Sequence, residues 1–365
     1  MISGFLTLFS TASVGNIKDF SQTAFYVRIA FSLISLLLAF KLILLLAISP
    51  TPDRVKKYLS LLLSLLLLFF GGDLGFMFVA RSFGTSYPLA DQNWMRKYWN
   101  PINSYGYRAN PIKVEDSKLK TNILVLGSSY TAGDGVEQIK DRYSNKLQEM
   151  LPEEYLVHNL GMCGSEAMDA YNRLMAYPVK PDMLIFAHTT KSIKGVSENN
   201  AETKTINFRI DNDLNPLSRY LVQNSYLLNY VFWKFYAPSK LSEKNLANFE
   251  NNAIFYYLQS EKIAAHLNNL QKFINYTDVN NIPLIVLAFP AMNEGIAFSK
   301  VIVCDPIEKF FIHKNVPFIG VYELVKDIPY TERAVNSTDA HPGIIVHRLI
   351  AEKLYETFKE NHFIN

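Results

Sequence analysis

LVLGSSYTAGDGV, residues 124–136, runs from an apolar stretch into a small, polar, glycine-punctuated one. Ser128 and Ser129 stand where the apolar stretch ends. Such a position is either a tight turn between a strand and a helix or the place where a serine nucleophile is presented. Backbone amides at such a turn can stabilise an oxyanion. A serine hydroxyl is a weak nucleophile that needs a base. Whether the rest of the chain supplies a base therefore decides between a simple turn and a serine nucleophile.

Short apolar segments alternate with segments of helical spacing on both sides of this stretch. The pattern predicts strands at 122–127, 155–161, 182–188, 282–290 and 316–321, and helices at 141–151, 167–177, 263–277, 306–315 and 343–360. Strands that are apolar throughout and alternate with helices are typical of a parallel sheet covered on both faces. The sequence therefore predicts an α/β domain at 121–362.

Residues 194–255 interrupt this rhythm with a polar and then an aromatic stretch. We expect an insertion between a strand and the next helix. In open α/β sheets such loops shape the ligand crevice, and the alternative is a packing flap without substrate contact. Residues 81–120 are rich in aromatic residues, Pro and Asn and are expected to form an irregular connector.

The first 80 residues are expected to form a membrane anchor. Residues 25–48 and 58–80 are each long enough to cross a bilayer as a helix. The basic loop at 50–57 between them favours the cytoplasmic side, which places both termini outside. Lys41 and Asp73 are ionisable residues within the spans. We expect Lys41 to extend toward the interface, and Asp73 to mark a helix irregularity near the outer end.

Composition excludes some functions. The formal net charge is +3, and no basic block indicates nucleic-acid binding. Two cysteines, Cys163 and Cys304, form neither a disulfide framework nor a zinc motif, and we expect both to be packed and unpaired.

A candidate base for the serines lies near the end of the chain. Asp339 and His341 precede Pro342 and the last predicted helix. An acid two residues from a histidine in a loop can orient the imidazole ring. The serines follow the first strand of the α/β unit, and the Asp-Ala-His sequence precedes its last helix. The two motifs together are therefore more informative than either motif alone.

Residues 120–360 resemble the GDSL, or SGNH, hydrolase family. The first block of that family matches GSSYTAG at 127–133, which implies Ser129 as the nucleophile. HNLGMCGSE at 158–166 resembles the second block and implies Gly164 as an oxyanion donor. TDAHPGIIVHRLIA at 338–351 resembles the last block and implies Asp339 and His341. The resemblance implies a flavodoxin-like three-layer sandwich and a mechanism that needs no metal or cofactor.

The chain departs from the family pattern at three places. Ser128 replaces the aspartate before the nucleophile, and Thr338 occupies the usual place of the acid. Lys191 and Ser192 replace the Asn-Asp of the third block. An ammonium group can donate hydrogen bonds, so Lys191 either replaces the asparagine as oxyanion donor or points to solvent. The nearby His188 is expected to be structural.

The resemblance predicts a membrane-anchored serine esterase. It would act on acylated glycans or lipids of the cell envelope, from the outer side of the cytoplasmic membrane. If a sugar hydroxyl instead of water accepted the acyl group, the protein would be an O-acyltransferase. The alternative of another class is a non-catalytic glycan-binding or assembly protein, which the substitutions at Lys191 and Ser192 motivate. The oligomeric state does not follow from the sequence.

Overall fold

The computed structural model describes residues 22–85, 87–196, 214–237, 249–293 and 295–364. Contacts divide the chain into two compact units. The helical unit comprises Met1–Lys97 and Asn207–Lys244, and the sheet unit comprises Tyr98–Ile206 and Asn245–Asn365. The first 21 residues and much of the insertion predicted at 194–255 lie outside the described residues.

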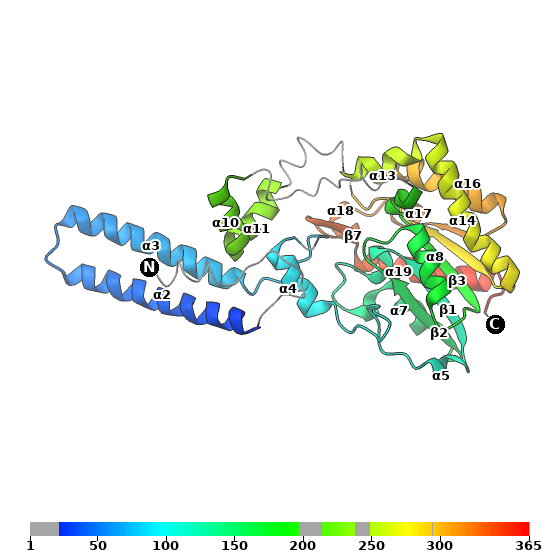
Figure 1. The fold of residues 1–365 in the computed structure, drawn as a ribbon, viewed down its shortest axis with the longest axis horizontal. Helices are drawn as coiled ribbons and strands as arrows, with labels where there is room; N and C mark the ends of the chain where they lie inside the picture. The colour runs from blue at the N-terminus through cyan, green and yellow to red at the C-terminus, as the bar shows by residue number, and fades with distance from the viewer. Residues whose placement is uncertain (1–21, 86, 197–213, 238–248, 294, 365) are drawn as a thin grey trace. The chain divides into compact units, whose positions relative to one another are not determined.

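The sheet unit is built on five parallel strands (Figure 1). Their order is β2-β1-β3-β4-β5, in which β1 lies between β2 and β3. This is the flavodoxin-like strand order, so the predicted fold class is confirmed. The strands are β1 (Thr121–Gly127), β2 (Tyr155–Gly161), β3 (Met183–His188), β4 (Leu284–Ala288) and β5 (Phe318–Gly320).

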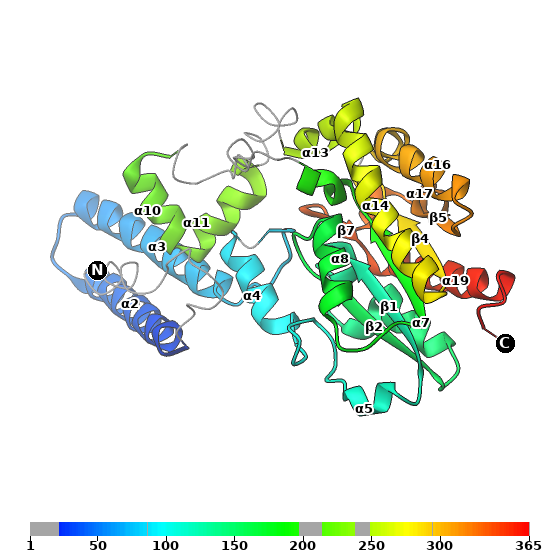
Figure 2. The same ribbon diagram turned by 45° about the vertical axis from the view of Figure 1, so that its right-hand side comes forward.

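Helices cover both faces of the sheet (Figure 2). Alternate residues of β1 point to opposite faces, so Leu124 and Leu126 join one apolar cluster, while Ile123 and Val125 join the other. The first cluster includes residues of α8 (Ala167–Ala176), α14 (Ser260–Asn280) and α16 (Asp305–His313). The second includes residues of α7 (Tyr143–Met150), α17 (Val321–Val325) and α19 (Ile344–Glu360). The unit is thus a three-layer sandwich.

The segment before the last helix differs from the expected loop. Residues of β6 (Ala334–Asn336) and β7 (Asp339–Pro342) pair antiparallel in a small second sheet. The side chain of Asn336 closes the turn between them, because its Oδ1 accepts hydrogen bonds from the backbone N–H and the hydroxyl of Thr338. Asp339 and His341 therefore lie on a strand, whose pairing fixes their backbone.

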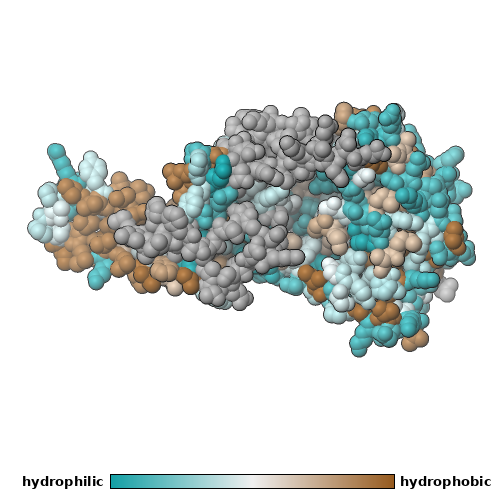
Figure 3. Space-filling view, viewed as in Figure 1, coloured by the Kyte–Doolittle hydropathy of each residue, from teal (hydrophilic) through white to brown (hydrophobic). Residues whose placement is uncertain are grey.

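The helical unit contains a long antiparallel pair, α2 (Gln22–Ile48) and α3 (Asp53–Phe76). Both helices are long and apolar enough to cross a membrane. Hydrophobic side chains cover much of their visible surface (Figure 3). Most of them are solvent-exposed, including Leu37, Leu44, Leu61 and Leu68. Length, composition and exposure agree with the two predicted spans, although α3 ends four residues before the predicted boundary.

Asp73 does not mark a helix irregularity, and that prediction was wrong. The helix α3 is continuous past Gly71 and Gly72 to Phe76. The carboxylate of Asp73 instead accepts a hydrogen bond from the guanidinium of Arg28 on α2, at 2.9 Å, and both side chains are buried. A buried charge is tolerated when it is paired and hydrogen-bonded, so the ion pair removes the need for a break in the helix.

Part of the predicted insertion belongs to the helical unit. Its described residues 214–237 form α10 (Pro216–Asn224), α11 (Tyr226–Val231) and the π-helical turn η4 (Phe232–Tyr236). Helix α11 packs on α3. Another part, α13 (Phe249–Tyr257), packs in the sheet unit against α14 and the 3₁₀ helix η3 (Thr190–Val196). A role of the insertion at a ligand crevice stays a prediction.

Candidate active site

The two serines lie at the carboxyl end of β1, where the chain turns into the short helix α6 (Ser129–Ala132). The carbonyl of Ser128 accepts hydrogen bonds from the amides of Thr131 and Ala132, which starts the helix directly after the strand. The Arg173 guanidinium on α8 donates to the carbonyls of Gly127 and Leu160, at 2.9 and 3.1 Å. The turn is thereby tied to the ends of both β1 and β2.

The helix α6 lies unusually close to β2. A Cβ atom on Gly161, the last residue of β2, would lie 2.2 Å from the backbone nitrogen of Ala132. The Asn159 amide group donates to the carbonyl of Thr131 at 2.7 Å, and its Oδ1 accepts from the amide of Gly161. Only a glycine at 161 lets the backbone of α6 reach the position that directs Ser129.

The structure brings Ser129, His341 and Asp339 together, although Ser129 and His341 are 212 positions apart in the chain. The Oγ of Ser129 lies 2.8 Å from Nε2 of His341. Nδ1 of His341 lies 2.6 Å from Oδ1 of Asp339. Since a carboxylate only accepts hydrogen bonds, Nδ1 is the protonated nitrogen and Nε2 accepts from the serine hydroxyl. The same Oδ1 accepts from the amide of His341 at 3.0 Å.

Ser128 points elsewhere. Its Oγ lies 3.5 Å from the hydroxyl of Thr189, which follows β3, and its side chain is buried. The two serines thus face different partners, and the geometry favours Ser129 over Ser128 as the residue next to the histidine.

Asp134 is a second carboxylate beside His341 that sequence reasoning missed. Its Oδ2 lies 3.7 Å from Nε2 of His341, and Cys163 donates to the same oxygen at 3.7 Å. The loop that carries Asp134 passes close to the acid: a Cβ on Gly135 would lie 2.8 Å from Oδ2 of Asp339, and the backbone there has φ +81°. The only signal in the sequence is an acid flanked by glycines five residues after Ser129.

The charges around His341 oppose the effect of burial on its pKa. Burial alone lowers the pKa of the imidazole, but the negative charges of Asp339 and Asp134 and the hydrogen bond to Asp339 raise it above 6.5 overall. Burial raises the pKa of Asp134, and the charge of Asp339 adds to that effect, while the imidazolium lowers it. Two carboxylates therefore stabilise the protonated form of the histidine, which is the form created when a serine hydroxyl gives up its proton.

The predicted oxyanion donors lie in turns next to the serine. Gly164 belongs to the turn after β2, and the amide of Met162 in this turn donates to the carbonyl of Gly127 at 3.2 Å. Lys191, on η3, is exposed. Burial raises the pKa of the Cys163 thiol, and the positive charge of Lys191 acts against that rise, as it acts against the rise in the pKa of His341.

Other predicted positions have structural partners. The hydroxyl of Ser192 accepts from the amide of Thr189 at 2.9 Å. Buried His188 lies 2.9 Å from His266 and 3.2 Å from the Tyr257 hydroxyl. Burial and the charge of His266 lower the pKa of His188 well below its usual range. Both cysteines are free thiols and Cys304 is buried, but Cys163 is exposed, so the expectation that Cys163 is packed was wrong.

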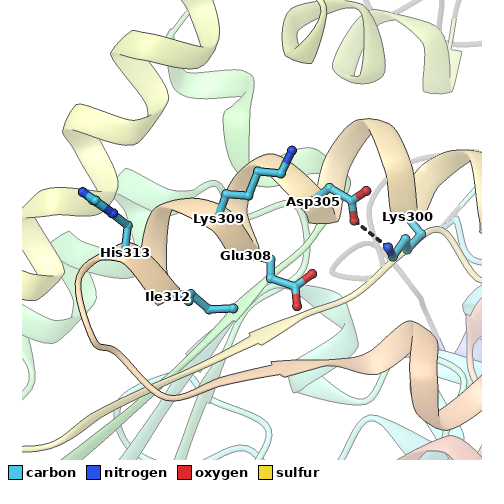
Figure 4. Close-up of a pocket in the computed structure, with 6 residues that line it drawn as sticks. All are labelled: Lys300, Asp305, Glu308, Lys309, Ile312 and His313. Carbon is cyan, nitrogen blue, oxygen red and sulfur yellow. Dashed lines mark ion pairs between the residues drawn. The ribbon is translucent and has the colours of Figure 1, made fainter.

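No group of three or more His, Cys, Asp or Glu side chains among the described residues is arranged to hold a metal ion. A surface hollow of about 670 Å³ lies along α16 and the π-helical turn η5 (Lys300–Cys304) before it, where Lys300 of η5 and Asp305 of α16 form an ion pair at 2.9 Å (Figure 4). None of the residues that line it is a predicted site residue.

The comparisons with known proteins gave matches among solved structures. No protein-family model and no curated protein matches the chain. Among solved structures, the chain is similar to a member of the lipolytic protein G-D-S-L family from Veillonella parvula, with 11% identity, a TM-score of 0.37, and 65% of this chain and 98% of that chain covered.

Two further solved structures are similar to the chain. A lipase/acylhydrolase from Enterococcus faecalis has 15% identity and a TM-score of 0.39, with 66% of this chain and 96% of that chain covered. A carbohydrate acetylesterase family member from Sinorhizobium meliloti has 10% identity and a TM-score of 0.38, with 66% and 98% covered. The fold class follows from the strand order and parallel register, independently of these matches.

The contact between Asp134 and His341 predicts a shift in pH dependence. Removing the Asp134 charge in Asp134→Asn lowers the pKa of His341, because one of the two carboxylates that raise it is lost. If His341 acts as a general base, which it does in its neutral form, the acid limb of the kcat/KM profile on a generic acyl ester should move to lower pH. Because Asp134 and His341 interact, the acid limb of the unmodified chain reports an apparent pKa of the two groups together.

The matched control is Glu352→Gln, which neutralises an exposed carboxylate paired with Arg348 on α19. It should leave the profile in place. An acid limb that stays fixed in Asp134→Asn, or moves to higher pH, would contradict an electrostatic role of Asp134.

Proposed function

We propose that the chain is a serine esterase in which Ser129 is the nucleophile, His341 the general base and Asp339 the residue that orients the imidazole. The single observation that carries this proposal is the continuous chain of contacts from Ser129 Oγ to His341 Nε2 at 2.8 Å and from His341 Nδ1 to Asp339 at 2.6 Å. A nucleophile within hydrogen-bond reach of a base, itself oriented by a third group, is the arrangement that covalent acyl transfer requires.

In the proposed mechanism, Oγ of Ser129 attacks the acyl carbon of an ester while its proton passes to Nε2 of His341. The tetrahedral intermediate collapses when the ester C–O bond breaks and the leaving alkoxide takes that proton. Water then attacks the acyl-serine, gives a proton to Nε2, and releases the acid as Oγ takes the proton back. Asp339 is 1% exposed, so its charge acts on the imidazolium with little screening by water.

The developing oxyanion needs donors. The proposal assigns the backbone amides of Ser129 and Gly164 to this role and adds the ammonium group of Lys191. The support for Lys191 is its place on η3, the segment that follows β3, and the fact that its positive charge acts on His341 and opposes the rise in the pKa of the imidazole. Preorganised donors of this kind account for much of the rate of acyl-transfer enzymes.

The cellular setting is also part of the proposal. The helices α2 and α3 would anchor the chain in the cytoplasmic membrane, with the 50–57 loop inside and the sheet unit outside. The substrates would be ester-linked acyl groups of envelope glycans or lipids. If a sugar hydroxyl replaces water in the second step, the same residues make an O-acyltransferase.

Labelling by a fluorescent fluorophosphonate tests the nucleophile without knowledge of the substrate. In the full-length chain in detergent, Ser129→Ala and His341→Ala should abolish labelling, because they remove the nucleophile and its base. Ser128→Ala, the matched control one residue away, should retain most of the labelling, since Ser128 faces Thr189. Labelling that is lost in Ser128→Ala and kept in Ser129→Ala would shift the nucleophile by one residue. No labelling of the unmodified chain would favour the non-catalytic alternative.

Kinetics of two Lys191 variants test the oxyanion role. Lys191→Ala should lower kcat by roughly a hundred-fold or more with little change in KM, because the donor acts mainly in the transition state. Lys191→Asn should keep much of the activity, since an amide N–H can donate to the same oxygen. Turnover of Lys191→Ala at the rate of the unmodified chain would remove this residue from the mechanism.

Cysteine accessibility tests the orientation of the anchor. A single cysteine introduced in the basic loop, Lys56→Cys, should resist a membrane-impermeant maleimide added to intact cells and should react after the membrane is opened. The exposed native Cys163 is replaced by Ser in this experiment. Reaction of the loop cysteine from the outside of intact cells would reverse the proposed topology.

A further inference from the structure

Helix α11 is fixed to the end of α3 by the buried charge of Asp73. The Asp73 carboxylate accepts from the hydroxyl of Ser225 at 2.7 Å and from the amide of Leu227 at 3.1 Å. The guanidinium of Arg28 bridges Asp73 and the carbonyl of Asn224. Ser225 is also the N-cap of α11, since its Oγ accepts from the amide of Leu228. A polar network of this kind holds α11 in one place on the paired helices.

This attachment sets the level of α11 along α3. Asp73 is three residues before the end of α3 at Phe76, which is about 4.5 Å along the axis. At Gly72 the two helices touch closely, because a Cβ there would lie 3.1 Å from a methyl group of Leu227. If α3 spans a bilayer, α11 begins at the depth where hydrocarbon gives way to headgroups.

One side of the segment 214–237 is packed within the helical unit. Phe232 and Trp233 are buried together with Phe83 and Ala90. Asn229 is fully buried, and its side chain accepts from the amide of Leu89 at 2.8 Å. These contacts fix the rotation of the segment, so its other side has a defined set of exposed residues.

Several apolar side chains of this segment and its neighbour are exposed. Leu217 is 67% exposed, Phe235 61% and Val231 42%, and Phe78, just after α3, is 63% exposed. Several of them on one small segment indicate a surface that is covered in the working protein.

The charge and aromatic content of the segment identify what covers it. Residues 214–237 contain two cations, Arg219 and Lys234, and no acidic residue. The Lys234 ammonium group lies 5.5 Å from the ring centre of Tyr230 and 5.4 Å from that of Phe235. Aromatic rings with cations beside exposed aliphatic residues are typical of segments that lie in the membrane interface next to anionic headgroups.

We propose that α10, α11 and η4 form a lipid-binding surface that lies flat in the interfacial layer of the bilayer, with Leu217, Val231 and Phe235 in the acyl-chain boundary and Arg219 and Lys234 at anionic headgroups. This inference rests on the anchoring of α2 and α3 proposed above. It is independent of the esterase chemistry. The surface would make the central part of the insertion a membrane element.

A fluorescent probe at single cysteines tests the surface in the full-length chain. Phe235→Cys and Leu217→Cys are made in a Cys163→Ser background, in which the remaining Cys304 is buried. Each is labelled with the fluorophore NBD and placed in nanodiscs with and without a phosphatidylcholine that carries a spin label near the headgroup. Leu61→Cys, on the exposed face of α3, reports the span itself, and NBD-labelled glutathione gives the signal of a probe in water.

The expected result is a loss of NBD emission in spin-labelled discs for 235 and 217, with a blue-shifted emission maximum relative to NBD-glutathione. The loss should be larger in discs that contain phosphatidylglycerol than in phosphatidylcholine alone, and Arg219→Gln/Lys234→Gln should remove that difference. Equal quenching in the two lipid compositions would overturn the assignment of the two cations to headgroups.

Two outcomes would overturn the surface and are distinguishable from a failure of the anchor. Emission at 235 and 217 like that of NBD-glutathione, with 61 shielded from water, would overturn the surface and leave the anchor intact. Shielding of 235 that depends on protein concentration in detergent, without quenching by lipid, would assign the surface to a second copy of the chain. NBD emission at position 61 like that of NBD-glutathione would overturn the anchor and the surface together. Fluorophosphonate labelling would still test the esterase separately.

Discussion

The close contact between the backbone of α6 and the last residue of β2 constrains the whole candidate site. With a Cβ at 161, α6 would be displaced, because the atom would lie 2.2 Å from the nitrogen of Ala132. Ser129 is at the start of that helix, and its hydroxyl meets a histidine that is fixed independently by β7. A shift of about 1 Å at such a position costs on the order of a hundred-fold in rate. Gly161 thus determines the geometry of the contact between Ser129 and His341, although it is neither partner in that contact.

Two buried arginines bind backbone carbonyls of α6 and of the loop that follows it. Arg108 donates to the carbonyls of Gly133, Val136 and Glu137, and Arg142 donates to those of Arg108 and Ala132. Burial lowers the pKa of Arg108 to about 10 and that of Arg142 to about 9, which leaves both cationic near neutral pH. The amides of Gly133 and Asp134 donate to the carbonyl of Ser129, and the two cations bind carbonyls of the same loop, so both kinds of contact fix the backbone around Asp134.

The sheet could be predicted because its strands are apolar throughout, and β2 spans the residues expected for it. The hairpin of β6 and β7 could not, since its strands are three and four residues long and carry no period. The predictions at Ser129, Asp339 and His341 drew on motif positions, and the structure brings these residues together. Asp134 was missed because its relation to His341 exists only in space, and Arg28 because its partner Asp73 is 45 positions away.

The separation of Ser129 from His341 has a consequence for biosynthesis. Ser129 is translated 212 positions before His341, and within the part of the chain that the structure describes, the strand of His341 pairs with its immediate neighbour in the chain. A nascent polypeptide that still lacks β7 therefore has a serine without a proton acceptor at Nε2. Chains that stall or are cleaved before this hairpin would be chemically silent, so the order of translation itself keeps the proposed chemistry from starting before the sheet is complete.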